Sequence, residues 1–191
     1  MFEKKDPFLA DYPACLPTEG NQLFSYLNLG KAVGIDFRKA SDLFAIKKSE
    51  VLVGVFPGGA ITSYAGLFSS VESNALSDVL QVAKKLNLPN VCICEGDTTT
   101  DYGAFALAES GTLIKRWAAL GNKTLVDDQN GSAISGNYSK TFQAYEVGKI
   151  SGAAVALNVL EEFLGRPFES YNFDELPVQI FNLPFLKSLF R

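Results

Sequence analysis

Three carboxylates, Glu95, Asp97 and Asp101, fall within a polar stretch that follows the apolar run at residues 91–94. Carboxylate oxygens that converge in one loop can bind Mg²⁺ or Ca²⁺. The spacing does not fit an EF-hand loop, because Tyr102 takes the sixth position, where the sharp turn requires glycine. The alternative is a solvated loop whose Asp and Thr side chains bond their own backbone. We favour this alternative, predict no metal site, and keep the three carboxylates as candidate binding residues.

The chain contains no histidine. This excludes Ser-His and Cys-His catalysis and every imidazole ligand, together with the side chain that titrates near neutral pH unaided. Catalysis would have to use carboxylates, lysine, tyrosine or a thiolate with a shifted pKa. Residues 148–151 resemble the end of a phosphate-binding loop, but Gln143 replaces the first glycine and Ile150 the final Ser or Thr. We predict no catalytic residue and no cofactor, although an enzyme is not excluded.

The segment Lys115-Arg116-Trp117 places the only tryptophan of the chain beside two cations. On a strand, Lys115 and Trp117 would share one face and Arg116 would take the other. An exposed Trp next to a cation is a typical anchor of a protein interface. The alternative, which the usual burial of Trp favours, places Trp117 in the core and Arg116 in water. Arg116 and Trp117 are both kept as candidate binding residues.

The three cysteines are Cys15, Cys92 and Cys94. Cys92 and Cys94 are two residues apart, so on a strand they would point to the same face. Three thiolates without a histidine fall short of the four ligands of structural zinc. We predict reduced cysteines packed in the core, which is typical of a cytoplasmic protein.

The chain has 17 basic and 21 acidic residues, a net charge of −4. Residues 51–110 contain two basic and six acidic residues, so this segment carries the whole net charge. Binding to nucleic acid depends on a concentrated basic face that neutralises phosphates. The sequence contains no such cluster, so we predict no nucleic-acid partner. A basic protein or a small cation is the natural partner of an acidic chain.

Between Glu50 and Glu72 lie 21 uncharged residues, a length that could cross a bilayer. Phe56-Pro57-Gly58-Gly59 interrupts this stretch, and its second half is rich in Ser, Thr and Tyr, so a β-hairpin explains it better. No apolar segment typical of a signal peptide follows the first seven residues. We therefore predict a protein with no membrane partner and a cytoplasmic location.

The first 20 residues contain three prolines and a glycine, which predict an irregular N-terminal arm. Residues 22–29 fit a short helix or a strand equally well. Apolar and β-branched runs predict short strands at residues 32–37, 43–46, 51–56, 60–68, 91–94, 102–108 and 112–120, with 123–126 as a further strand. Two hairpins are expected, one closing at Pro57-Gly58 and one at residues 109–111. The run at 91–94 is apolar on both faces, which is typical of an interior strand.

Two amphipathic or apolar segments predict the main helices. The first begins with a capping box between Ser69 and Glu72 and ends before Asn87 and Pro89. The second spans residues 150–164 and ends at Gly165. Between the two, residues 127–140 are typical of a flexible loop. The C-terminal stretch 176–191 predicts a short strand followed by a helical turn.

These elements predict an α+β fold, in which an antiparallel or mixed sheet is built from hairpins and two main helices pack on it. Hairpins imply antiparallel pairing, and two helices are too few to connect parallel strands throughout. We expect an irregular N-terminal arm over residues 1–20 and a single α+β domain over residues 21–191.

The segment 101–117 resembles a pattern in small uncharacterised bacterial α+β proteins, in which a strand with Tyr-Gly-Phe-like residues turns at a glycine into a strand ending near Arg and an aromatic residue. Glu146 and the helix end at residues 163–167 fit the same outline, and the resemblance covers about 80 residues. Some of these proteins are thought to be immunity proteins that neutralise a toxin. The resemblance implies the fold class and a protein partner, and it supplies no catalytic residues.

Two functional hypotheses follow. The first is an acidic protein-binding module, such as an immunity protein or an inhibitor, because complementary charge speeds the capture of a basic partner. The second is an enzyme or small-ligand-binding protein that uses Glu95, Asp97 and Asp101, with or without a divalent metal. We favour the first.

Overall fold

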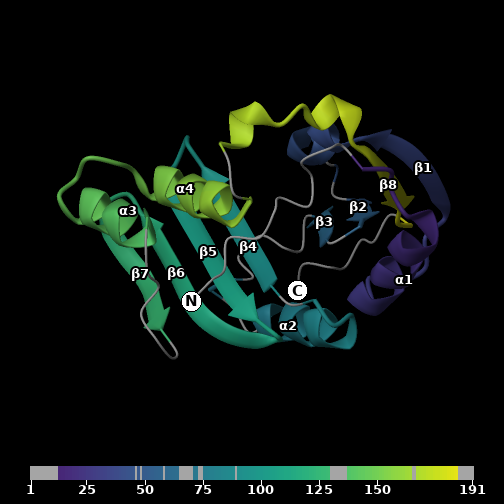
Figure 1. Cartoon of the computed structure of the whole chain (residues 1–191), viewed down its shortest axis with the longest axis horizontal. Coiled ribbons are helices and arrows are strands. Elements are labelled where there is room, and N and C mark those ends of the chain that lie inside the picture. Colours follow the sequence, from purple (N-terminus) through teal and green to yellow (C-terminus); the bar gives the residue numbers. More distant parts are fainter. Residues whose placement is uncertain are drawn as a thin grey trace. The chain divides into compact units, whose positions relative to one another are not determined.

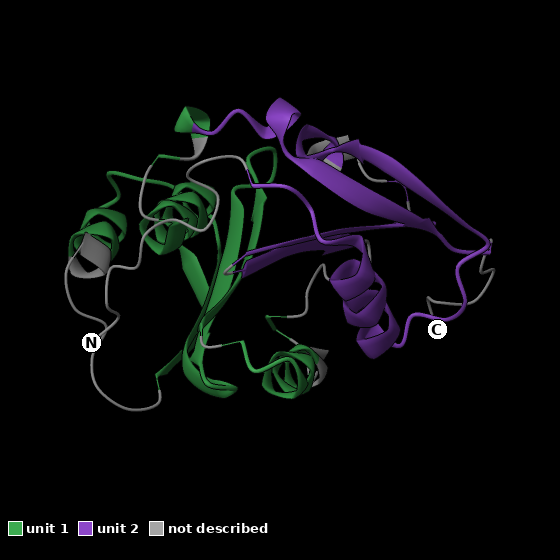
Figure 2. Ribbon diagram, turned by 45° about the vertical axis from the view of Figure 1, so that its right-hand side comes forward, with its two compact units in different colours: residues 1–7, 69–170 green, residues 8–68, 171–191 purple. Residues whose placement is uncertain are grey.

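The computed structural model describes residues 13–45, 47, 49–57, 59–64, 71–72, 75–88, 90–129, 137–164 and 167–184. The chain divides into two compact units, which Figure 2 shows in green and purple. Unit 1 comprises residues 1–7 and 69–170, and unit 2 comprises residues 8–68 and 171–191. In the described residues each unit contains one four-stranded antiparallel sheet.

Strands and helices together make this an α+β protein, which confirms the predicted fold class. The finer expectation of one sheet with two helices was not accurate, because the described residues form two sheets and four α-helices. The arm and single-domain boundaries stay predictions, although Pro17 already begins a helix inside the predicted arm. Among the described residues, no helix is both long enough and apolar enough to span a membrane.

The sheet of unit 1 is a meander in which each strand pairs with the next along the chain, in the order β4-β5-β6-β7 (Figure 1). Its strands are β4 (Asn90–Asp97), β5 (Tyr102–Glu109), β6 (Thr112–Leu120) and β7 (Lys123–Gln129). The β5–β6 turn has positive φ at both Ser110 and Gly111, the geometry that short hairpin connections favour. The hairpin predicted at this place and the further strand from residue 123 are confirmed.

One strand prediction in this sheet was wrong in its position. The run at residues 91–94 was expected to form an interior strand, whereas β4 lies at the edge of the sheet and, within the described residues, pairs only with β5. The apolar character has another cause. Helix α4 packs along β4 on the face of Cys94, and Ile93 on the opposite face is also buried. The run at residues 91–94 is therefore apolar because both faces of β4 are covered, and not because strands flank β4 on both sides.

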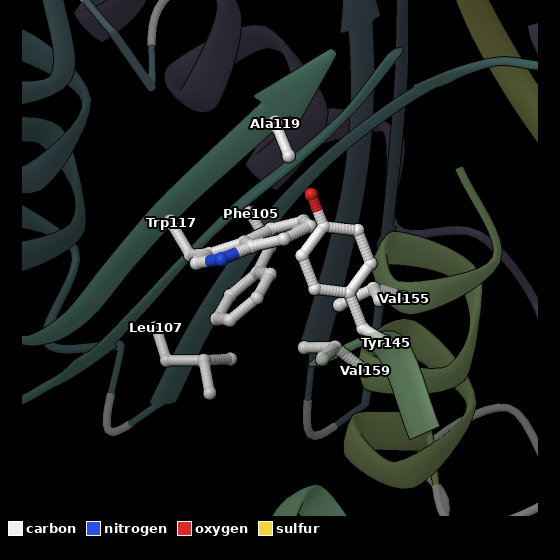
Figure 3. Packing of buried hydrophobic residues seen from close by; sticks show 7 residues of the cluster. All are labelled: Phe105, Leu107, Trp117, Ala119, Tyr145, Val155 and Val159. Atoms are coloured by element: carbon white, nitrogen blue, oxygen red, sulfur yellow. The ribbon is translucent and has the colours of Figure 1, made fainter. Parts of the chain in front are cut away.

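Helices α3 (Asn137–Glu146) and α4 (Gly152–Leu164) pack against each other, and α4 packs on β4 and β5 (Figure 1). The buried cluster between them and the sheet is Phe105, Leu107, Trp117, Ala119, Tyr145, Val155 and Val159 (Figure 3). Gly103 is required where α4 meets β5, because a Cβ there would lie 1.9 Å from the Gly152 carbonyl oxygen. This close approach holds the first turn of α4 at the end of the β4–β5 hairpin.

The helix predictions had mixed outcomes. The helix at residues 150–164 is confirmed as α4. The helix predicted from the capping box is α2 (Ala75–Lys85), which begins later than expected. Val71 and Glu72 lie in a turn, and Ser69 and Gly165 lie outside the described residues. The loop predicted at residues 127–140 was wrong at both ends, because β7 reaches Gln129 and α3 begins at Asn137.

The sheet of unit 2 has the order β1-β8-β2-β3, so its C-terminal strand lies between two strands from the first third of the chain. The strands are β1 (Gly34–Lys39), β2 (Glu50–Phe56), β3 (Gly59–Tyr64) and β8 (Pro177–Asn182). The predicted β2–β3 hairpin and the C-terminal strand are confirmed; residues 185–191, where a helical turn was predicted, lie outside the described residues.

Helix α1 (Pro17–Leu27) covers one face of this sheet. Phe24 stacks on Phe181 of β8 with ring centroids 4.1 Å apart. The helix begins with proline in its first turn, where the missing N–H costs nothing. The ambiguous segment 22–29 is therefore largely helical. The strand predicted at residues 43–46 was wrong, because residues 40–45 form a 3₁₀ helix, and residue 46 lies outside the described residues.

Candidate functional site

The end of the β4–β5 hairpin brings together the carboxylates that the sequence singled out. Asp97 is the last residue of β4, and its two carboxylate oxygens accept hydrogen bonds from the Thr99 N–H and the Thr100 hydroxyl, both at 2.8 Å. The hydrogen bond from the Thr100 hydroxyl, followed by that from the Thr99 N–H, lowers the pKa of Asp97. Asp97 therefore stabilises its own turn, as the solvated-loop interpretation expected, and its carboxylate remains exposed.

Asp101 completes the turn before β5. Its φ of 56° is in the left-handed region, and its carbonyl oxygen accepts a hydrogen bond from Gly121 N–H at 3.0 Å, which ties the β4–β5 turn to the β6–β7 turn. The Oδ1 atom of Asp101 is buried and has no hydrogen-bond partner in the part of the chain that the structure describes. Asp101 thus contributes negative charge at the hairpin end without neutralisation by a neighbouring cation among those residues.

Glu95 lies two residues before Asp97 on β4. Because side chains alternate along a strand, it is on the sheet face opposite to Cys94. It is 6% exposed and pairs across the ladder with Ala104 of β5. Burial is the main cause of the raised pKa of both Cys94 and Tyr102, and the charge of Glu95 adds to it. Glu95 therefore influences its neighbours electrostatically while its own side chain is buried.

Sequence reasoning missed two members of this group, Tyr102 and Glu72. The Tyr102 hydroxyl donates a hydrogen bond to Glu72 Oε1 at 2.6 Å. Burial, this hydrogen bond and the charge of Glu95 together raise the pKa of Tyr102. The signal for Tyr102 was present in the hairpin register, because Tyr102 pairs with Asp97 and lies diagonally across from Glu95. Glu72 was interpreted as a helix cap, and only the folded chain shows its contact with Tyr102.

We call Glu72, Glu95, Asp97, Asp101 and Tyr102 the hairpin-end cluster. Among the described residues, no three His, Cys, Asp or Glu side chains converge in a way that could hold a metal ion. Glu95, Asp97 and Asp101 are close in sequence and Glu72 is distant, and the four carboxylates are divided between the turn backbone, the buried sheet face and the contact with Tyr102. The arrangement provides negative charge and hydrogen-bond acceptors instead of a coordination sphere.

The thiols of Cys92 and Cys94 could act as nucleophiles only as thiolates, and the pKa values of both are raised. Burial, aided by the charge of Glu95, raises the pKa of Cys94 to about 12, and burial also raises the pKa of Cys92 well above its usual value. Cys94 Sγ donates to the carbonyl oxygen of Ala156 in α4 at 3.2 Å. Both thiols therefore stay protonated at neutral pH and serve packing. The predicted common face of the two cysteines is confirmed, since Cys92 also packs against the core cluster.

Trp117 and Arg116 take opposite faces of β6. Trp117 is 2% exposed and lies in the core, where its ring meets Tyr145 edge to face at 5.1 Å (Figure 3). Of the two alternatives, the structure therefore has the buried one. Arg116 is partly buried, donates to Asp128 of β7 through Nε at 3.0 Å, and reaches the carbonyl oxygen of Val71 at 3.5 Å. Neither residue joins the hairpin-end cluster.

Comparison of the chain with protein-family models, with curated proteins and with solved structures gives no significant match. Functional inference therefore depends on the arrangement of the residues themselves.

Proposed function

We propose that the protein is a binding module that captures a basic protein partner through the carboxylates of the hairpin-end cluster. The main support is a difference between two ends of the same sheet. On β7, Asp127 is paired with Lys115 and Asp128 with Arg116. At the hairpin end, Glu72, Asp97 and Asp101 form no ion pair with any basic side chain among the described residues. Uncompensated carboxylates attract basic groups and speed their encounter.

The chemistry of the other side chains supports binding over catalysis. Without histidine, a reaction would need a thiolate, a phenolate, a lysine or a carboxylate of suitable pKa. The pKa values of Cys92, Cys94 and Tyr102 are all raised, which keeps these groups protonated and removes them as bases or nucleophiles at neutral pH. Lys115 is buried beside Asp127 and lies 5.3 Å from the ring centre of Phe142.

An immunity protein or an inhibitor is the class that fits this proposal. Such proteins neutralise a partner by covering its surface and need no reactive group of their own. The acidic segment and the resemblance of residues 101–117 to bacterial immunity-like proteins agree with this class. Arg116, whose side chain is 26% exposed, is paired with Asp128 and lies outside the hairpin-end cluster, whereas Trp117 supports the strand from inside the core.

The test uses the basic proteins encoded beside the gene, each purified and mixed with the full chain. Carbodiimide treatment couples carboxylates to lysines that are in ion-pair contact, and mass spectrometry identifies the coupled residues. We expect coupling through Glu72, Asp97 or Asp101. Coupling only through other carboxylates would contradict the proposed site, and binding by none of these proteins would contradict the proposed partner class.

A matched pair of variants separates the site from net charge. The triple variant Glu72→Gln, Asp97→Asn and Asp101→Asn keeps hydrogen-bond acceptors at each position, and Asn tolerates the left-handed conformation of residue 101. The control, Glu109→Gln, Glu146→Gln and Glu169→Gln, removes the same charge from other exposed sites of unit 1. We expect the first variant to slow association about tenfold at low salt and the control to slow it far less. Equal effects would contradict a localised site.

A further inference from the structure

Strand β1 forms one edge of the sheet of unit 2 and, within the described residues, pairs only with β8. Ala40 N–H bonds to the Leu176 carbonyl oxygen at 2.8 Å, in register with the β1–β8 ladder. In an antiparallel ladder, successive residues direct their backbone groups alternately to the two sides. Even-numbered residues of β1 therefore bond to β8, and the N–H and C=O groups of Ile35, Phe37 and Lys39 point to the open side.

This edge carries exposed apolar side chains beside the charged Asp36, Arg38 and Lys39. Val33 is 71% exposed, Ile35 is 48% exposed and Phe37 is 61% exposed. Ile35 and Phe37 share one face of the strand. Exposed edges are commonly blunted by proline, bulges or charged side chains, because an open ladder invites pairing with another chain. The charges of β1 have both signs, so a second copy can match them, and an open edge with matched charges and exposed apolar side chains is a natural site for strand addition.

We propose that β1 pairs antiparallel with β1 of a second copy of the chain, about a two-fold axis at Phe37. The open backbone groups belong to odd-numbered residues, which allows axes at Ile35, Asp36, Phe37 or Arg38. An axis at Asp36 or at Arg38 would place that charged residue opposite its own symmetry mate, and directly opposed like charges destabilise a sheet. An axis at Ile35 would place Asp36 opposite Gly34 of the second copy and would form no charge pair.

The axis at Phe37 is the register in which charge and packing agree. It places Asp36 opposite Arg38 of the second copy, twice by symmetry, and stacks the two Phe37 side chains against each other. Within each copy Arg38 bonds the buried Glu50 at 2.9 Å and Asp36 accepts from Asn182 at 3.1 Å, both toward β8, so the Asp36–Arg38 pairs contribute charge complementarity across the seam. The four-stranded unit 2 sheets of the two copies then form one continuous sheet across the dimer. This surface lies in unit 2 and is independent of the hairpin-end cluster in unit 1.

The first test is sedimentation equilibrium of the full chain over a range of concentrations. We expect a reversible monomer–dimer equilibrium. The variant Asp36→Arg places two like charges opposite each other at both symmetric positions and should weaken the dimer about tenfold or more. Glu19→Arg makes the same charge change on the exposed side of α1 and should leave the dimer unchanged. A wild-type chain that remains monomeric at about 1 mM, or equal effects of the two variants, would overturn the proposal.

The second test fixes the register by oxidation of single introduced cysteines. In the proposed register, two Phe37→Cys residues face each other about 5.5 Å apart between Cα atoms, within the range of a disulfide. Two Ile35→Cys residues would lie about 14 Å apart, because Ile35 pairs with Lys39 of the second copy, which is four residues along the strand from Ile35 of that copy. We expect rapid covalent dimers from Phe37→Cys alone, above the background of the wild-type cysteines. Dimers from Ile35→Cys instead, or from neither variant, would overturn the register.

Discussion

The sheets of unit 1 and unit 2 both have four strands, but the strands follow one another differently along the chain. In unit 1, every strand pairs with its neighbour in sequence, and each link is a short turn. In unit 2, β8 enters between β1 and β2 from more than a hundred residues away. Local pairing costs little chain entropy, whereas the closure of a long loop must be offset by burial. The residues of β8 meet this requirement, because Val178, Gln179, Ile180 and Phe181 are all buried.

The largest expected effect comes from removing β8. A chain ending at Ser170 loses the strand that joins β1 to β2, while all strands of unit 1 keep their partners. We expect β1 and β2 to lose protection in hydrogen exchange and β4–β7 to retain it, since protection follows cooperative units. A chain ending at Pro184 keeps β8 and serves as the control. Retained protection of β1 and β2 in the shorter chain would show that β8 is dispensable.

Next in size is the loss of the core aromatic of unit 1. Trp117→Ala removes the ring that packs on Phe105, Phe142 and Tyr145, and should lower the free energy of unfolding by about 4 kcal/mol. Leu125→Ala on the exposed strand β7 should change it by less than about 1 kcal/mol. Urea unfolding measures both. Similar losses for the two variants would mean that Trp117 is not a principal core residue.

The corresponding weak point of unit 2 is the Arg38–Glu50 ion pair, which spans β8 to connect β1 and β2. Arg38→Met leaves the carboxylate of Glu50, only 3% exposed, without its main partner, and should cost about 3 kcal/mol. Arg38→Lys retains a charge and should cost less. Both are measured by urea unfolding at pH 7, and a cost for Arg38→Met below that of Arg38→Lys would contradict the role of the pair.

The same pair predicts how stability depends on pH. Burial acts to raise the pKa of Glu50, but the hydrogen bonds from Arg38 and from the Lys47 N–H outweigh it and leave the pKa below its usual 4.5. The ionised form is therefore favoured by folding, and its contribution is present above pH 4.5 and lost as the pH falls through the folded-state pKa. Glu50→Gln should flatten the acid side of a stability–pH profile. An unchanged slope would exclude Glu50 as its cause.

The smallest effect is expected at the hairpin end. Asp97→Ala removes the acceptor for Thr99 and Thr100 and should destabilise unit 1 by about 1 kcal/mol. Asp97→Asn keeps one carbonyl acceptor and should lose about half as much. Thermal unfolding distinguishes the two. A larger loss for Asn than for Ala would mean that charge, and not the turn hydrogen bonds, is what unit 1 requires.

Prediction from sequence succeeded where the signal is local. The β2–β3 and β5–β6 hairpins and helix α4 were recognised because turn residues and apolar periodicity act within a few residues. It failed at α3, whose polar composition gives little periodicity, and at residues 43–45, whose apolar side chains suggested a strand. At the candidate site, Glu95, Asp97 and Asp101 were proposed from their types and stay a prediction, while the contact between Tyr102 and Glu72 was missed because it joins residues thirty positions apart.

The amino-acid sequence by itself determined the α+β class, the main hairpins, helix α4 and the acidic character of the hairpin end, since each follows from neighbouring residues or from composition. Only the tertiary structure decided that β8 enters the sheet of unit 2, that β4 is an edge, that Trp117 is buried and that Tyr102 meets Glu72. These outcomes depend on which distant surfaces can bury one another, and that balance is a property of the whole packed chain.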